Sequence, residues 1–358
     1  MLDQIAVLDR FNAVVGHPAR TIAWGDSMGG LISAGLIQRY PEHFSGAVTL
    51  SGIVAGIVGT FNEVLDRTFA LNMLLASGQL EVVHITHLKK DVKLATKALV
   101  EAQATPQGRA RIDLVAALMD LPGWNELSAP NPPQPGPHDY LSREKYNYST
   151  LQFTTGFWYG ARESYESLAG GNPSWNTAVD YRRQLQRSVD FADVKALYER
   201  AGISLDADLD MLNKQPGIEP DPPALSYAIK NIVYNGRITV PVLTLHTIGD
   251  EFANVQHVQA YAAAVGEARG SDLLRDLFVH RAGHVNFTSA EVIIGLEALV
   301  RRLDTGAWRN IEPRQLNAAA LDLGPRFNRL LPPTRVSASA AFIKYQPAPF
   351  PRPFDRGG

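Results

Sequence analysis

The sequence predicts an α/β fold in which a parallel sheet carries a large, mostly helical insertion. A β-type run at about 20–24 is followed by a glycine-rich turn, a helical pattern and a second strand at about 46–51. Far downstream, apolar runs at about 240–246 and 275–280 flank a helical pattern from Val255 to Ala264. Strands that alternate with helices in this way typically form one parallel sheet.

The first strand leads into the pattern G-x-S-x-G, with Ser27 at its centre. Glycines at 25 and 29 lack a Cβ atom, so strand and helix can meet there in a sharp turn that lifts the serine hydroxyl off the backbone. Residues 31–40 have apolar side chains at helical spacing and are stopped by Pro41. The motif therefore stands in the strand–turn–helix context that a nucleophilic serine needs, and Ser27 is the predicted nucleophile.

A nucleophilic serine needs a histidine base and an acid that orients it. Asp250 lies on the loop after the strand at 241–246, and His284 begins a loop just past the strand at 273–280, preceded by the turn residue Gly283. The carboxyl ends of parallel strands are where the sites of open α/β sheets lie. In serine sites of this strand–turn–helix type, the nucleophile, the acid and the histidine follow one another along the chain in the order Ser, Asp, His.

Each of these two assignments has a rival nearby. Glu251 is adjacent to Asp250 and is the alternative acid. His280 lies four residues before His284, but its place inside an apolar run favours a structural role. His246 ends the preceding strand and is expected to be a packed or hydrogen-bonded core residue.

These segments resemble the α/β-hydrolases, and the double glycine of GDSMGG (25–30) is similar to their esterase and prolyl-oligopeptidase-like branches. The resemblance covers residues 1–60 and 236–305, and is also carried by TIGDEF (247–252) and RAGHVNF (281–287). It implies that Ser27 is the nucleophile, His284 the general base and then acid, and Asp250 the residue that holds the imidazole. The backbone N–H of Met28 would be one oxyanion-hole donor.

The chain departs from this family at its amino end. Only 26 residues precede Ser27, the helical pattern Met1–Val15 occupies most of them, and no HGG-like loop is present for a second oxyanion donor. The family's amino-terminal strands are therefore expected to be absent, which leaves the strand at 20–24 at or near an open edge. That edge would be covered by the amino-terminal strands of a longer enzyme, by the carboxyl tail, or by a second copy of the chain in a homo-oligomer.

The predicted catalytic core is discontinuous, with residues 1–61 and 236–305, and residues 62–235 form a helical cap insertion. Five prolines within 130–137 divide this cap, and the residues 306–358 form a tail rich in Pro, Ala and Arg. Helical periodicity is present at 62–76, 89–102, 109–121 and 177–201. In the tail, Ser337–Tyr345 is a candidate edge strand and Pro347–Gly358 is expected to be extended or disordered.

Two segments are candidates for binding substrate. Trp158 and Tyr159 belong to an aromatic stretch of the cap, which either lines a pocket above Ser27 or packs as the cap's own core. Ile53 lies in the apolar segment after the strand at 46–51, which is either a pocket wall or a buried turn.

Composition excludes several other classes. With 34 Lys and Arg against 36 Asp and Glu, the net charge is −2, and there is no basic run for nucleic acid. The absence of cysteine excludes disulfides and thiolate metal sites. The apolar stretch at 50–61 is too short to span a bilayer. No signal peptide is apparent at Met1, and the sequence does not identify the cellular compartment.

No cofactor or metal is expected. His84 and His87 have a spacing that can hold a metal on a helix, but no third ligand accompanies them.

The expected activity is hydrolysis of a small carboxylic ester through an acyl-enzyme. The alternatives are a peptidase or amidase of the prolyl-oligopeptidase-like type, and a truncated, non-catalytic remnant that acts as a binding module.

Overall fold

The computed structural model describes residues 1–352, which divide into two compact units. The first, here called the sheet unit, comprises Met1–Gly56 and Tyr234–Pro347. The second, the helical unit, comprises Ile57–Val233 and, of the described tail, residues 348–352. The insertion expected at 62–235 thus covers almost the same residues as the helical unit. That the insertion and the core are separate domains stays a prediction.

The sheet unit contains a mostly parallel sheet, as the sequence predicts. Its strand order is β1-β2-β3-β4-β5; β1 to β4 are parallel and β5 is antiparallel to β4. The strands are β1 (Ile22–Asp26), β2 (Gly46–Leu50), β3 (Val242–Gly249), β4 (Leu274–Ala282) and β5 (Phe342–Ile343). Every residue of β2 and β3 is buried, which is why their sequences are nearly continuous apolar runs.

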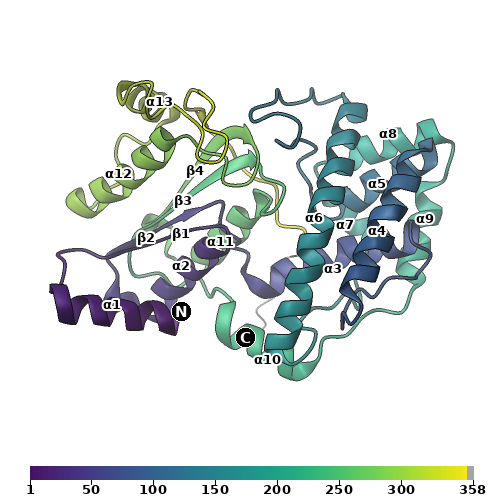
Figure 1. The fold of residues 1–358 in the computed structure, drawn as a ribbon, viewed down its shortest axis with the longest axis horizontal. Helices are drawn as coiled ribbons and strands as arrows, with labels where there is room; N and C mark the ends of the chain where they lie inside the picture. The colour runs from purple at the N-terminus through teal and green to yellow at the C-terminus, as the bar shows by residue number, and fades with distance from the viewer. Residues whose placement is uncertain (353–358) are drawn as a thin grey trace. The chain divides into compact units, whose positions relative to one another are not determined.

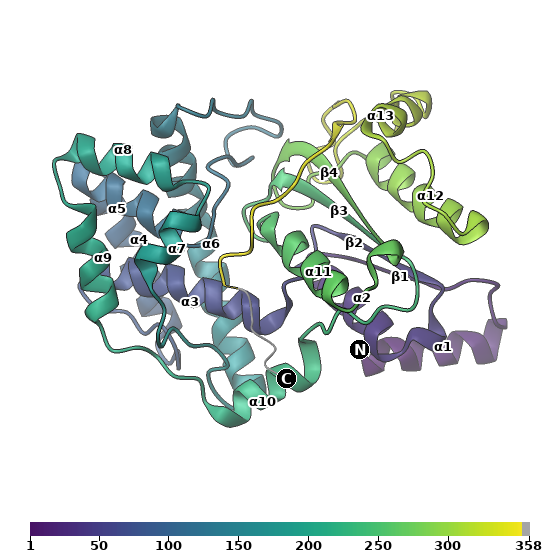
Figure 2. The ribbon, with the colours of Figure 1, turned by 180° about the vertical axis from the view of Figure 1, so that it is seen from behind.

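Helices cover both faces of this sheet (Figures 1 and 2). On one face lie α2 (Met28–Arg39) and α11 (Gln256–Glu267), and on the other lie α12 (Ser289–Thr305) and α13 (Pro313–Asp322). An apolar core joins the sheet to α12, α13 and β5. The sheet unit also contains α1 (Leu2–Val15) and the 3₁₀ turns η1 (Pro41–His43) and η2 (Ser271–Leu273). The arrangement is a three-layer α/β/α architecture.

The two edges of the sheet differ. Within residues 1–352, β1 pairs only with β2, so the strand that precedes Ser27 is an edge strand, as expected. The candidate tail strand is much shorter than Ser337–Tyr345, because only Phe342 and Ile343 pair, and they pair with β4. The idea that the tail covers the edge beside the nucleophile strand is therefore wrong.

The helical unit has one core, formed from helices before and after the proline-rich segment. Its helices are α3 (Gly56–Leu74), α4 (Leu88–Gln103), α5 (Pro106–Ala117), α6 (Tyr140–Ala169), α7 (Tyr181–Arg187), α8 (Phe191–Ala201), α9 (Leu205–Lys214) and α10 (Pro222–Ile232). The helix expected over 177–201 is interrupted, because Ser188 is extended and its hydroxyl donates to Asp120 at 2.5 Å. No helix within the described residues is long and apolar enough to cross a membrane.

The carboxyl tail contributes to the helical unit at Arg352. Its guanidinium lies 2.7 Å from both carboxylate oxygens of Asp66 in α3, and also donates to the carbonyl of Trp175 at 2.8 Å. Asp66 is fully buried and also accepts from Tyr181 and Gln184. Up to Arg352 the tail is therefore a packed segment; the rest of the stretch expected to be disordered lies outside the described residues.

Candidate active site

Ser27 stands at a strained turn between β1 and α2. Its backbone has φ 53° and ψ −120°, a left-handed conformation that is unfavourable for a residue other than glycine. The turn is held because the Ser27 N–H donates to the carbonyl of Leu50 at 2.9 Å, and the Ser27 carbonyl accepts from Gly30 at 3.0 Å. The strain therefore falls on the residue that the sequence predicts as nucleophile.

The glycines around Ser27 make this turn possible. A Cβ atom on Gly25 would lie 2.2 Å from the backbone of Gly29, and one on Gly30 would lie 2.7 Å from the Cα of Gly52. A Cβ atom on Gly29 would meet nothing closer than Asp26 Oδ1, at 3.7 Å. Of the two glycines in G-x-S-x-G, Gly25 is thus the one that sterics require, because the helix backbone passes against it.

Asp250 follows β3 at the carboxyl edge of the sheet and is fully buried. Its Oδ1 accepts the backbone N–H groups of Phe252 at 3.0 Å and Ala253 at 2.9 Å. Burial alone would raise the pKa of Asp250, but attraction to His284 and the hydrogen bonds that the carboxylate accepts outweigh it and hold this pKa below its usual value. Asp250 is therefore a carboxylate at neutral pH.

His284 follows β4 and lies against this carboxylate. Its Nδ1 is 2.9 Å from both Oδ1 and Oδ2 of Asp250, and its side chain is 18% exposed. The ring of Phe252 packs beside the imidazole, with centroids 5.2 Å apart. A proton on Nδ1 is fixed by the carboxylate, which leaves Nε2 as the ring's acceptor.

The rival residues occupy other places. His246 is buried, and its Nε2 lies 2.6 Å from the carbonyl of Ala253, so it bonds to the same loop that binds the Asp250 carboxylate. Burial lowers the pKa of His246 to about 4, and the ring is neutral at pH 7. His280 is exposed on β4, where its backbone N–H donates to Ala341. Glu251 is buried beside Asp250, but it is the Asp250 carboxylate that lies against His284 Nδ1.

The sequence did not single out the groups that fix the loop of His284. Thr247 Oγ1 donates to the carbonyl of Gly283 at 2.6 Å, on the amino side of His284. Ser51 Oγ accepts the N–H of Val285 at 3.2 Å, on its carboxyl side. Short polar residues at strand ends are common, and no sequence pattern marks these two as partners of a loop more than thirty residues away.

Met28 and Ile53 both lie near Ser27. Met28 is the first residue of α2, where backbone N–H groups have no partner within the helix and the helix dipole favours negative charge. Its side chain is 64% exposed. Ile53 is half-buried, and its N–H donates to the Ser27 carbonyl at 3.4 Å.

The helical unit contains four of the candidate binding residues: Trp158, Tyr159, His84 and His87. Trp158 and Tyr159 lie in α6, each 3% exposed, and Tyr159 belongs to the unit's apolar core. This burial favours the alternative that the aromatic stretch packs as core of the helical unit, and substrate binding by these two residues stays a prediction. His84 and His87 do not lie together on a helix, because His84 precedes α4 with a left-handed backbone and His87 is the N-cap of that helix.

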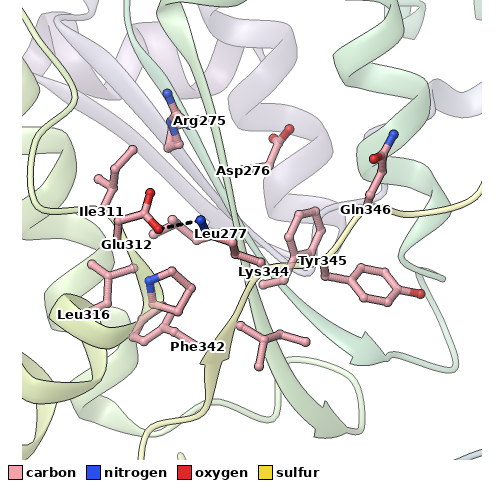
Figure 3. Close-up of a pocket in the computed structure, with 13 residues that line it drawn as sticks. Arg275, Asp276, Leu277, Ile311, Glu312, Leu316, Phe342, Lys344, Tyr345 and Gln346 are labelled. Atoms are coloured by element: carbon pink, nitrogen blue, oxygen red, sulfur yellow. Dashed lines mark ion pairs between the residues drawn. The ribbon is translucent and has the colours of Figure 1, made fainter.

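A separate cavity lies at the other end of β4. It measures about 510 Å³ and is bounded by residues 275–278 of β4, the start of α13 and the tail around Tyr345. Figure 3 shows the ion pair between Lys344 and Glu312, 2.8 Å apart, among its lining side chains. None of Ser27, Asp250 and His284 lines it. Within residues 1–352, no group of three or more His, Asp or Glu side chains is arranged to hold a metal ion.

A parallel sheet with helices on both faces, a serine at a strained strand–helix turn, and an acid and a histidine after later strands define a hydrolase of the α/β-hydrolase fold. The chain belongs to the family of the o-phthalyl amidase of Xanthobacter agilis, to which it is 34% identical over 342 residues, covering 88% of this chain and 74% of the amidase. No protein-family model matches the chain.

Two solved structures are also similar. Feruloyl esterase B from Aspergillus oryzae is 13% identical with a TM-score of 0.35, and the match covers 85% of this chain and 63% of the esterase. Tannin acyl hydrolase from Aspergillus niger is 12% identical with a TM-score of 0.30, covering 84% and 60%. The chain thus spans less than two thirds of either of these structures.

Proposed function

We propose that this protein is a serine hydrolase that cleaves a carboxylic amide or ester through an acyl-enzyme, with Ser27, His284 and Asp250 as its triad. The observation that carries the proposal is the contact of His284 Nδ1 with the buried carboxylate of Asp250, 2.9 Å away. A proton held on Nδ1 by that contact makes Nε2 the nitrogen that accepts a proton, which is what a general base beside a serine requires.

In the first half-reaction, the Ser27 hydroxyl oxygen forms a bond to the substrate carbonyl carbon, and its proton passes to His284 Nε2. The carbonyl oxygen becomes negatively charged and accepts the N–H of Met28, at the positive end of α2. The carbon–nitrogen or carbon–oxygen bond of the substrate then breaks, and His284 returns the proton to the leaving amine or alcohol. Asp250 stabilises the imidazolium that exists between these two transfers.

In the second half-reaction, water attacks the Ser27 acyl ester. His284 takes a proton from this water, and the released proton returns to the Ser27 oxygen as the acid leaves. Each proton transfer uses the same nitrogen atom, because the Asp250 carboxylate occupies the other side of the ring. Ile53, whose backbone contacts Ser27, is proposed to contribute to the wall around the substrate's acyl part.

The family relationship favours amides. The relative that shows the family is named an o-phthalyl amidase, and its match covers 88% of this chain. We therefore propose amides of o-phthalic acid as the first substrates to test, which favours the amidase alternative over simple esters. The same acyl-enzyme route cleaves esters as well, since an alcohol leaves more readily than an amine.

The test compares an o-phthalyl anilide with the matched aryl ester of the same acid, using Ser27→Ala as the background for spontaneous hydrolysis. We expect turnover of both compounds that is lost in Ser27→Ala and His284→Ala and retained in the matched histidine control His280→Ala. Turnover of the ester alone would favour an esterase. A folded protein that turns over neither compound would favour the binding-module alternative.

A further inference from the structure

We infer that Ser51 is a positioning residue for His284, holding the histidine loop in a left-handed backbone conformation at Val285. The inference deepens the proposed function and rests on it for its catalytic consequence. Ser51 touches neither the substrate nor the reacting atoms in this account; it acts through the loop that places the base.

The backbone of Val285 is strained. Val285 has φ 57°, in the left-handed region that is unfavourable for residues with a Cβ atom and worst for β-branched ones. Such a conformation persists only where neighbouring contacts fix it. Because Val285 directly follows His284, rotation at Val285 would redirect the chain on one side of the imidazole.

Ser51 forms a hydrogen bond with Val285. The Ser51 hydroxyl oxygen accepts the Val285 N–H at 3.2 Å, and Ser51 itself is fully buried, with its own N–H donating to Leu245. Ser51 is thus anchored in the sheet between β2 and β3. Ser51 itself has a left-handed backbone, with φ 44°, so its hydroxyl is positioned by its burial and by the bond to Leu245.

The residue before Ser51 holds the turn of the proposed nucleophile, Ser27. The preceding residue, Leu50, accepts the N–H of Ser27 through its carbonyl at 2.9 Å. Two adjacent residues at the end of β2 therefore hold the turn of Ser27 and the loop of His284. Strand β2 lies between β1, which carries the nucleophile, and β3, which carries the acid. The end of β2 sets the position of one loop against the other.

The remaining contacts of the loop do not replace this bond. Thr247 fixes the carbonyl of Gly283, and the Gly283 N–H donates to Gly249, both on the amino side of His284. On the carboxyl side, Asn286 Nδ2 donates to the carbonyl of Ala282 and Arg281 Nη1 donates to the carbonyl of Asn286. The Phe287 N–H donates to the Val285 carbonyl at 2.9 Å, so it fixes the carbonyl of this residue and not its N–H. Ser51 supplies the bond to the backbone amide next to the histidine.

The experiment measures how fast a fluorophosphonate probe labels Ser27 in Ser51→Ala, Ser51→Thr and the unchanged protein. A misplaced base costs on the order of 10²-fold in rate, so we expect Ser51→Ala to label ten- to a hundredfold more slowly. Ser51→Thr keeps the hydroxyl but adds a methyl group to a buried residue with φ 44°, so we expect it to recover part of that loss while lowering the unfolding temperature. The control is Thr49→Val, which removes a buried β2 hydroxyl for which the described structure provides no hydrogen-bond partner; its labelling rate and unfolding temperature should match those of the unchanged protein.

A second measurement is independent of activity. Proton NMR of the full chain should show a downfield Nδ1 proton from the bond between His284 and Asp250, identified by its loss in His284→Ala. In Ser51→Ala this signal should shift or broaden, and amide exchange at Val285 should become faster; Ser51→Thr should restore both in part.

The two proposals fail in different ways. If the unchanged protein takes no label, the proposed function is overturned, and the NMR signals alone decide the role of Ser51. An unchanged His284 signal and Val285 exchange rate in Ser51→Ala would overturn the positioning role. Equal loss of labelling in Ser51→Ala and Thr49→Val would also overturn it, because general weakening of β2 would then explain both.

Discussion

His284 Nδ1 lies 2.9 Å from both carboxylate oxygens of Asp250, although the two residues follow different strands and are 34 positions apart in the chain. Asp250 is fully buried, whereas the histidine keeps 18% of its side chain exposed. The buried carboxylate has its geometry fixed by two backbone N–H groups.

This pair predicts a strong effect of changing the acid. Asp250→Asn keeps the size of the side chain but removes the charge that holds the Nδ1 proton. We expect the rate of probe labelling at Ser27 to fall by about 10³- to 10⁴-fold, as loss of the orienting acid does in serine triads. Glu251→Gln, at the adjacent buried acid, is the matched control and should label at a rate close to that of the unchanged protein. A larger loss in Glu251→Gln would reassign the acid.

The two glycines of the serine motif should differ in their tolerance of a methyl group. Gly25→Ala places a Cβ atom 2.2 Å from the backbone of Gly29, so the strand or the helix must move. We expect this variant to be destabilised by about 2 kcal/mol or more, within the range of severe steric changes. Gly29→Ala has open space and a helical backbone, and its unfolding midpoint should be unchanged or raised. Equal midpoints for the two variants would contradict the described turn.

The ion pair between Arg352 and Asp66 should contribute strongly to the free energy of unfolding, although Arg352 lies near the chain end. Arg352→Gln leaves a buried carboxylate with only neutral partners, and such a loss costs about 3–5 kcal/mol. The double variant Asp66→Asn with Arg352→Gln should be more stable than Arg352→Gln alone, because no buried charge is left over. Urea unfolding measures both.

Arg182→Gln provides the surface comparison for that experiment. Arg182 pairs with Asp206 and Asp210, whose side chains are exposed, and such exposed pairs contribute little to stability. Equal losses in Arg182→Gln and Arg352→Gln would mean that the tail does not supply a buried counter-charge.

Glu144 predicts a pH dependence of stability in the helical unit. Burial raises the pKa of Glu144 to about 7, above its value in the unfolded chain. Between about pH 4.5 and 7 the folded state therefore binds more protons at this site, so its contribution to the free energy of unfolding falls as pH rises. Glu144→Gln should reduce this slope, whereas the exposed Glu199→Gln should leave it unchanged. A steeper fall with pH in Glu144→Gln would contradict the sign.

The sequence could predict the strands and the order of the proposed triad because both depend on local patterns. Continuous apolar runs predicted β2 and β3, and Gly25 marked the turn at Ser27. Contacts between distant segments left no such pattern. Nothing local to Ser51 indicates that it accepts from Val285, and nothing near Arg352 indicates Asp66. The aromatic stretch around Trp158 was ambiguous for a similar reason, since a pocket wall and a helical core require the same side chains.

Mass spectrometry of the chain after reaction with a fluorophosphonate tests the central claim most directly, because it reports which serine reacts without any choice of substrate. Ser27 is predicted to carry the label, with an apparent rate that falls as pH drops through the titration of its base. His284→Ala should abolish labelling and His280→Ala should not. A label on another serine, or a folded protein that stays unlabelled at pH 8, would contradict the account.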